Sequence, residues 1–233
     1  MTSQPTPQPA ARPECPEPPA ARTFPVHHHP TSSAPDPQLR LETLLVRSGT
    51  GTDPATGAIT TPIHLSTAYG HPGLGESTGY DYTRTASPTR DVLQDALARL
   101  EGGTAAFALS SGMAALELVT RTLAPHGSRI VALRDLYGGS FRFLEVLAEE
   151  GAARVDFVLG IEGLRGALAD PADLVVIETP TNPMMEEIPI PETAELAHAA
   201  GARLVVDNTF YTPVVQRPLE LGADVVVHSG TKY

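Results

Sequence analysis

From about residue 90 onward, apolar side chains alternate between helical spacing and short continuous runs. Apolar residues recur every three or four positions over 90–101, and Gly102-Gly103 then ends the pattern, so a helix is predicted there. The same spacing predicts helices over 111–123, 141–150 and 191–200. Short apolar runs predict strands over 105–109, 129–133, 155–159, 174–177, 203–206 and 225–227.

Strands that alternate with helices are typical of crossover connections between parallel strands. The pattern therefore predicts an α/β fold with a mostly parallel sheet and helices on both faces. In such sheets, ligands bind beyond the carboxyl ends of the strands. Those ends carry hydroxyl, acidic, amide and amine groups, namely Ser110-Ser111-Gly112-Met113, Asp135, Glu178 with Asn182, Asp207 with Asn208, and His228 to Lys232. We expect these groups to collect on one edge of the sheet.

The first forty residues differ in composition from the rest of the chain. They hold 11 of the 23 prolines, together with Ser, Thr and Gln. Such a stretch cannot bury enough apolar surface to offset its ordering entropy, so a disordered tail is predicted over 1–40. The run His27-His28-His29 could bind a metal weakly, but a solvated run is the favoured interpretation, and no metal site is predicted.

The net charge of −11 argues against binding nucleic acid or an anionic membrane through a broad basic surface. It leaves a local anion site open. Cys15 is the single cysteine, so no intrachain disulfide can form. No apolar run approaches membrane-spanning length, and the N-terminus lacks the apolar segment of a signal peptide. The sequence therefore predicts a cytoplasmic protein with no membrane partner.

Lys232 follows the last apolar strand pattern and stands among small residues, with Ser229 and Thr231 nearby. A lysine in that place can form a Schiff base while the hydroxyl groups bind an adjacent phosphate. Taken alone, a solvated surface lysine is the more frequent explanation, because most lysines are exposed. The other groups on the same edge reverse that preference.

Two of those groups suit a phosphorylated ring. Ser110-Ser111-Gly112-Met113 opens a helix directly after an apolar run, where free N–H groups and the helix dipole favour a phosphate. An ordinary serine N-cap explains the same residues equally well. Asp207 ends an apolar run, and its carboxylate could keep a ring nitrogen protonated. A turn or cap aspartate is the commoner role for such a residue.

Two aromatic segments could complete such a site. Tyr137-Gly138-Gly139 is predicted in a loop, where the glycines leave room for a flat ring and the tyrosine could stack on it or transfer protons. A glycine turn with a half-buried tyrosine is the alternative. Tyr82 and Arg84 offer donors for a phosphate, although an exposed strand would explain that segment as well. Pyridoxal 5'-phosphate is one ligand that uses all of these groups at once.

Seven motifs follow one another along the chain. They are Gly57-Ala58-Ile59 with Pro62-Ile63 and Ser66-Thr67, Tyr80-Asp81-Tyr82-Thr83-Arg84 with Ser87-Pro88-Thr89-Arg90, Ser110 to Ala115, Asp135 to Ser140, Glu178 to Pro183, Val206 to Phe210, and His228 to Tyr233. In this order they resemble the Cys/Met-metabolism family of pyridoxal-phosphate enzymes, and the resemblance runs from about Leu41 to Tyr233. The family includes cystathionine γ-synthases, cystathionine lyases, methionine γ-lyases and O-acylhomoserine sulfhydrylases.

The resemblance implies a role for each candidate residue. Lys232 would attach the cofactor and shuttle protons, and Asp207 would pair with the pyridine nitrogen. Asn182 would hydrogen-bond the phenolic oxygen, and Tyr137 would stack on the ring and assist proton transfer. The phosphate would be held by Gly112, Met113, Ser229 and Thr231. Tyr82 and Arg84 would reach the phosphate of a neighbouring subunit, so the site would form only in a dimer, within a tetramer.

The resemblance also implies the domain organisation. Residues 41–89 would form an arm against the partner subunit, and 90–233 the large domain of the aspartate-aminotransferase-like fold, type I. Ser87 stands where the family usually has asparagine. Family members continue beyond the lysine into a small domain whose arginine binds the substrate carboxylate. The chain is therefore expected to be an N-terminal fragment with an incomplete sheet, and to be poorly soluble or inactive alone.

The implied reactions are γ-replacement or elimination on homoserine esters or cystathionine, as in cystathionine γ-synthases and γ-lyases. Gly139 favours that branch, because methionine γ-lyases typically have cysteine there. O-acetylhomoserine sulfhydrylase, methionine γ-lyase and cystathionine β-lyase activities stay open. A non-catalytic remnant that only binds the cofactor or a partner is the alternative from another class. A plain nucleotide-binding domain is disfavoured, because no Gly-x-Gly-x-x-Gly fingerprint follows a first strand.

Overall fold

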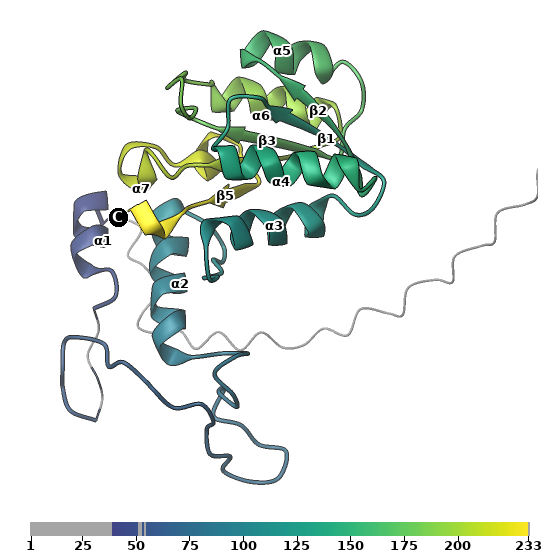
Figure 1. Cartoon of the computed structure of the whole chain (residues 1–233). Helices are drawn as coiled ribbons and strands as arrows, with labels where there is room; N and C mark the ends of the chain where they lie inside the picture. Colours follow the sequence, from purple (N-terminus) through teal and green to yellow (C-terminus); the bar gives the residue numbers. More distant parts are fainter. Residues whose placement is uncertain (1–38, 51–52, 54, 233) are drawn as a thin grey trace, which may run out of the picture.

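A computed structural model of the chain describes residues 39–50, 53 and 55–232. Within them, five strands form one parallel sheet in the order β2-β1-β3-β4-β5 (Figure 1). The strands are β1 (Ser128–Leu133), β2 (Ala153–Val158), β3 (Leu174–Glu178), β4 (Arg203–Asp207) and β5 (Val225–Val227). Every residue of β3 is buried, which is why its sequence is a continuous apolar run rather than an alternating one.

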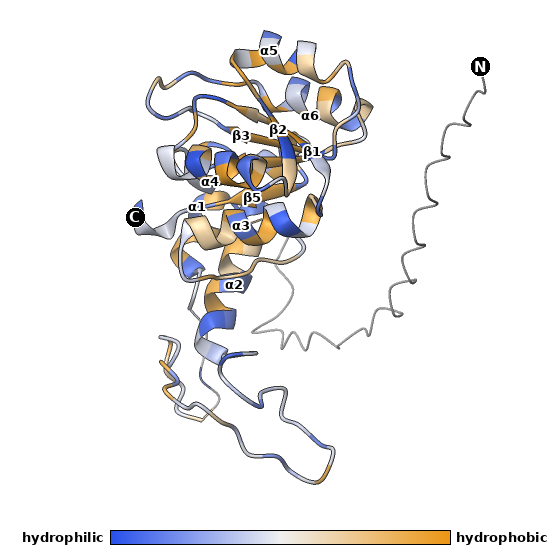
Figure 2. Cartoon of the chain, turned by 45° about the vertical axis from the view of Figure 1, so that its right-hand side comes forward, coloured by the Kyte–Doolittle hydropathy of each residue, from blue (hydrophilic) through white to orange (hydrophobic). Residues whose placement is uncertain are grey.

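Helices cover both faces of this sheet, as the pattern predicts. The longer helices are α2 (Pro88–Glu101), α3 (Gly112–Leu123), α4 (Gly138–Glu149), α5 (Gly160–Ala167) and α6 (Ile190–Ala199). Helices α3 and α4 lie on one face and α5 and α6 on the other (Figure 1). The strands form the most hydrophobic layer of the molecule, between helices whose outer faces are polar (Figure 2). Ile130, Leu144, Leu164 and Ile177 are among the fully buried side chains of this core.

The register of the strands brings the candidate residues to one level. Glu178 at the end of β3 pairs with Asp207 at the end of β4, and Asp207 pairs with Val227 at the end of β5. Because all strands run in one direction, their carboxyl ends share one edge of the sheet. The expectation that polar groups collect on one edge is therefore confirmed by the register.

The predicted strand over 105–109 is wrong. In the structure this run belongs to no strand, and Phe107 and Leu109 are exposed. Ala108 donates its N–H to the side chain of Gln94 on α2. Among the described residues no strand lies beside the run to complete a ladder, and an apolar sequence without a partner cannot form one.

Several helical elements differ from the prediction. Helix α5 was not predicted, because Gly160, Gly163 and Gly166 lower the helical propensity of the segment. Helix α4 begins at Gly138 rather than 141, so Tyr137 is its N-cap and the two glycines form its first turn instead of a loop. Short elements without a periodic pattern were also missed, namely α1 (Leu41–Arg47), α7 (Thr212–Val215), η1 (Pro218–Leu221) and η2 (Gly230–Lys232).

Between α1 and α2 the chain forms an extended arm that projects from the sheet domain (Figure 1). Ile59, Ile63, Leu65 and Leu74 on this arm are exposed. The predicted tail, with Cys15 and the histidine run, lies outside the described residues apart from Leu39 and Arg40. None of the helices in the described part of the chain is long and apolar enough to cross a membrane.

Candidate active site

A cavity of about 220 Å³ opens at the carboxyl edge of the sheet, between the strand ends and the first turns of α3 and α4. A single water takes about 30 Å³ of liquid volume, so the cavity has room for a small organic group. Eight of the ten candidate residues line it: Gly112, Met113, Tyr137, Asn182, Asp207, Ser229, Thr231 and Lys232. The structure therefore brings together residues that are up to 120 positions apart, from Gly112 to Lys232.

The N-terminus of α3 forms one wall of the cavity. Ser111 is the N-cap, and its hydroxyl accepts the N–H of Ala114 at 3.1 Å. The N–H groups of Gly112 and Met113 have no acceptor inside the helix, because they belong to its first turn. They are available to an anion at the positive end of the helix dipole.

The turn that follows β5 lies directly against this helix end. A Cβ built on Gly112 would lie 2.8 Å from the Cβ of Ser229, a contact that real side chains do not make. The N–H of Ser229 is fixed by the hydroxyl of Thr209 at 2.9 Å. Gly112 is therefore required by the close approach of the turn to α3, and donors from both segments face one space.

Lys232 ends the short helix η2 in this turn. Its N–H bonds the carbonyl of Ser229 at 3.1 Å, and its Nζ lies 5.9 Å from the centroid of the Tyr137 ring. Lys232 is also the only lysine among the 233 residues. This fact supports its assignment as the amine of the site, and it is visible in the sequence alone. A single amine side chain therefore faces the cavity, beside an aromatic ring.

Hydrogen bonds from Thr209, just after the end of β4, hold the side chain of Asp207. Its Oδ1 accepts the N–H of Thr209 at 3.0 Å and the Thr209 hydroxyl at 2.5 Å. Both hydrogen bonds found among the described residues use Oδ1, which leaves Oδ2 for a ligand in the cavity. Thr209 was not a predicted site residue, yet it holds both Asp207 and the turn before Lys232.

Asn182 lies in the loop after β3, which local hydrogen bonds close. Thr181 N–H bonds the carbonyl of Glu186 at 2.9 Å, and Met185 N–H bonds the carbonyl of Thr181 at 3.0 Å. The Asp135 carboxylate accepts the N–H of Met184 at 3.3 Å. The loop therefore holds Asn182 where it lines the cavity.

Glu178 lines the cavity, and no role was predicted for it. Its Oε2 accepts the N–H of Tyr137 at 2.6 Å, and only 4% of the residue is exposed. Burial, together with the negative charges of Asp207 and Asp135, raises the pKa of this carboxyl to about 7, although the Tyr137 N–H acts in the opposite direction. Glu178 therefore positions the N-cap of α4 and titrates near neutral pH.

The raised pKa of Glu178 predicts a pH dependence of stability. The unfolded chain loses this proton near its ordinary pKa of 4.5, while the folded chain holds it to about pH 7. The folded state therefore binds the proton more tightly, and the contribution to the free energy of unfolding is lost as pH rises from about 4.5 to 7. In Glu178→Gln, which cannot titrate, the melting temperature should fall less between pH 5 and 8. Parallel melting curves for both proteins would contradict this assignment.

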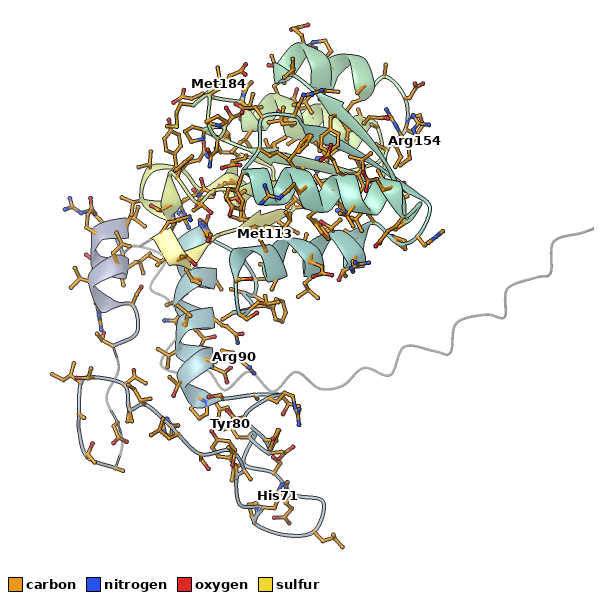
Figure 3. All side chains as sticks on the ribbon, in the orientation of Figure 1. His71, Tyr80, Arg90, Met113, Arg154 and Met184 are labelled. Atoms are coloured by element: carbon orange, nitrogen blue, oxygen red, sulfur yellow. The ribbon has the colours of Figure 1, made fainter. Side chains whose placement is uncertain are left out.

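Tyr82 and Arg84 are not brought to the cavity of their own chain. They lie on the arm, with the Arg84 guanidinium 5.0 Å from the centroid of the Tyr82 ring. Tyr80, two residues before Tyr82, sits on the projecting arm far from Met113 of the cavity (Figure 3). Sequence patterns identified both residues as phosphate donors, but a single chain does not place them at the site.

The residues that line the cavity fit pyridoxal phosphate. Free N–H groups at a helix end and the Ser229 and Thr231 hydroxyls suit its phosphate, and Asp207 Oδ2 suits a protonated ring nitrogen. The Lys232 amine is a group that could bind its aldehyde. The close approach of Gly112 to Ser229 brings the N–H groups of α3 near the hydroxyl groups of the Ser229 turn, as binding of one phosphate requires.

Gly112→Ala is expected to weaken pyridoxal phosphate binding by about tenfold or more, because the added methyl group would force α3 and the Ser229 turn apart. The dissociation constant can be measured by absorbance titration. Gly166→Ala on α5 is the matched control, since its added methyl group meets open space. Equal affinity in both variants would show that the close approach does not matter for binding.

Comparison with known proteins agrees with this geometry. The family described as Cys/Met metabolism PLP-dependent enzyme matches residues 42–233. A cystathionine gamma-synthase of Haemophilus influenzae is 47% identical over 199 residues, which cover 84% of this chain and 54% of that protein. A Bacillus subtilis protein named cystathionine gamma-synthase/O-acetylhomoserine (thiol)-lyase is 46% identical over 195 residues, covering 83% and 52%.

Solved structures show the same relationship. The crystal structure of cystathionine gamma synthase from Xanthomonas oryzae pv. oryzae, in complex with aminoacrylate and cysteine, matches with a TM-score of 0.79 and 42% identity. The match covers 82% of this chain and 50% of that one. The chain thus spans about half the length of the relatives it matches. From the family match and the architecture of the sheet edge, the chain belongs to the Cys/Met-metabolism family of PLP-dependent enzymes.

Proposed function

We propose that the protein acts as a cystathionine γ-synthase, which replaces the γ-substituent of an O-acylhomoserine with the thiol of cysteine. The observation that carries the proposal is the convergence of Lys232, Asp207 and the N-terminus of α3 on one cavity. The resemblance to synthases at 46–47% identity supports this choice of reaction. Gly139 in the first turn of α4 fits it as well, since the sequence expectation for a methionine γ-lyase is cysteine.

Each cavity residue has a proposed task. Bound pyridoxal phosphate supplies an electron sink for negative charge at the substrate Cα. The N–H groups of Gly112 and Met113, with the Ser229 and Thr231 hydroxyls, bind the phosphate, and Asp207 keeps the ring nitrogen protonated. Asn182 hydrogen-bonds the phenolic oxygen. Lys232 Nζ removes and returns protons at the substrate carbons, and Tyr137 contacts the ring and assists proton transfer.

The substrate and the reaction can be tested directly. Because residues 1–233 are expected to be inactive alone, the assay uses the full-length protein, in which O-acetylhomoserine and cysteine should yield cystathionine and acetate. If sulfide gives homocysteine with a higher kcat/KM, the protein is a sulfhydrylase, an alternative that the double name of the Bacillus subtilis relative supports. If cystathionine alone gives cysteine, ammonia and 2-oxobutanoate, it is a γ-lyase, and pyruvate with homocysteine would indicate a β-lyase. No product in any assay would favour the non-catalytic remnant.

We also propose that the site is completed in trans by the arm of a second copy, within a dimer or tetramer. Tyr82 and Arg84 stay away from the cavity of their own chain, and the same arm exposes Ile59, Ile63 and Leu65. Exposed apolar side chains on a projecting segment favour burial against a partner. The cytoplasmic location expected from the sequence stays a prediction.

This arrangement predicts complementation between two inactive variants. Arg84→Ala and Lys232→Ala should each be inactive. Mixed after dissociation and reassociation, they should regain about a quarter of the wild-type activity, because half of the dimers are mixed and each has one intact site. Activity that does not return on mixing, in samples proven to form mixed dimers, would contradict a site built from two chains.

A further inference from the structure

A buried acid–base pair lies behind the cavity, outside the residues that line it. Glu101, the last residue of α2, contacts His228 with 2.5 Å between Oε1 and Nε2. The two side chains are 7% and 12% exposed. His228 directly follows β5 and directly precedes the turn from Ser229 to Lys232. The two residues are 127 positions apart in the sequence. Their contact joins the end of α2 to the start of the turn from Ser229 to Lys232 (Figure 1).

The pair belongs to a larger polar network beneath the sheet edge. Asn208, a fully buried residue next to Asp207, donates to Glu101 Oε1 at 3.4 Å and to the Gln216 carbonyl at 2.9 Å. The Gln216 amide donates to Asn208 Oδ1 at 3.0 Å and to the carbonyl of Thr179 at 3.3 Å. The network therefore connects α2 with the ends of β3, β4 and β5, the strands that lead to Asn182, Asp207 and Lys232.

Glu101 is in an unfavourable place for a carboxylate. It lies at the C-terminal end of a helix, where the helix dipole is negative. It is 5% exposed, and its Oε2 has no hydrogen-bond partner within the described part of the chain. A buried, half-satisfied carboxylate is costly to the folded state. A gain in stability therefore does not explain a glutamate at this position. Its one strong contact is with His228, which precedes the turn from Ser229 to Lys232.

We propose that Glu101 is a positioning residue that acts through His228. By holding the imidazole, it fixes the turn from Ser229 to Lys232 against the N-terminus of α3. The inference rests on the proposed cofactor site, because the turn carries two of its phosphate donors and its amine. Displacement of a positioned group by about 1 Å can lower a reaction rate about 100-fold, so a contact that fixes this turn should affect catalysis as well as cofactor binding.

Three variants test the proposal. Glu101→Met keeps the size of the side chain and removes the acceptor, while Glu101→Gln retains an oxygen that can accept from His228. Glu101→Met should weaken pyridoxal phosphate binding by about tenfold or more, and Glu101→Gln should stay within a few-fold of wild type. Leu164→Ala, in the core under α5 and remote from the network, controls for loss of stability alone.

A readout without cofactor separates this proposal from the proposed function. Hydrogen exchange of the backbone amides in 228–232 should be faster in Glu101→Met than in both wild type and Leu164→Ala. A double-mutant cycle should show that Glu101→Met adds little once His228→Leu is present. Unchanged exchange in the turn, or additive effects of the two substitutions, would overturn the positioning role. Failure of the wild-type protein to bind pyridoxal phosphate, with the exchange result as expected, would overturn the proposed function and leave the positioning role intact.

Discussion

In the proposed γ-replacement reaction, Lys232→Ala is expected to lower turnover of an O-acylhomoserine by about 10³-fold or more. The substitution removes the amine that faces the cavity beside Tyr137, and the chain has no second lysine to replace it. A positioned acid or base alone contributes about 10²- to 10⁴-fold to a rate, and the same residue also attaches the cofactor. Steady-state assays with O-acetylhomoserine and cysteine measure the loss.

Lys232→Arg is the matched control for charge. Arginine retains a positive charge in the turn but cannot lose its proton to act as a nucleophile or base. Both variants should fold with melting temperatures near that of the wild type without cofactor, since Lys232 is exposed. Turnover within tenfold of the wild type in either variant would show that Lys232 takes no part in the reaction.

Asp207→Asn is expected to lower kcat/KM by about 10²- to 10³-fold, the usual cost of removing one preorganised electrostatic partner. Asparagine can still accept the Thr209 N–H through Oδ1, so the end of β4 should keep its conformation. It cannot supply the negative charge that keeps a ring nitrogen protonated. The defect should therefore appear in turnover with little change in melting temperature.

Asp207→Glu tests the geometry of the same interaction. It retains the charge and moves the carboxylate by one methylene, so it should retain more activity than Asp207→Asn. Equal kinetics in Asp207→Asn and wild type would show that this carboxylate has no role in the reaction. Pairing with the ring nitrogen predicts that activity is highest in the wild type, lower in Asp207→Glu and lowest in Asp207→Asn.

Local sequence predicted the sheet well because its central strands, β1, β3 and β4, are largely buried on both faces. Continuous apolar runs such as those of β3 and β4 occur where no face is solvated, and five of the six predicted strands are present. The run over 105–109 is likewise apolar, but no strand in the part of the chain that the structure describes lies beside it. Pairing is a property of the tertiary structure, so composition could not distinguish it from a strand.

The cavity residues were predictable for a related reason. Parallel strands bring their carboxyl ends together, so motifs after each strand had to converge, and eight candidates do so. The roles of Glu178 and Glu101 were not predictable. Glu178 bonds an N–H 41 positions away, and Glu101 contacts a histidine 127 positions away. No local pattern encodes such contacts, and only the folded structure shows which partner each carboxylate meets.

Borohydride reduction of the protein with pyridoxal phosphate tests the central claim most directly. Reduction fixes a bond between the cofactor and an amine, and peptide mass spectrometry then locates the modified residue. Lys232 is the only lysine among the 233 residues, so its peptide should carry the label in near-stoichiometric amount. Lys232→Ala should carry none in that peptide. An unlabelled Lys232 peptide, or equal labelling of both proteins at the α-amino group alone, would contradict a cofactor site at the carboxyl edge of this sheet.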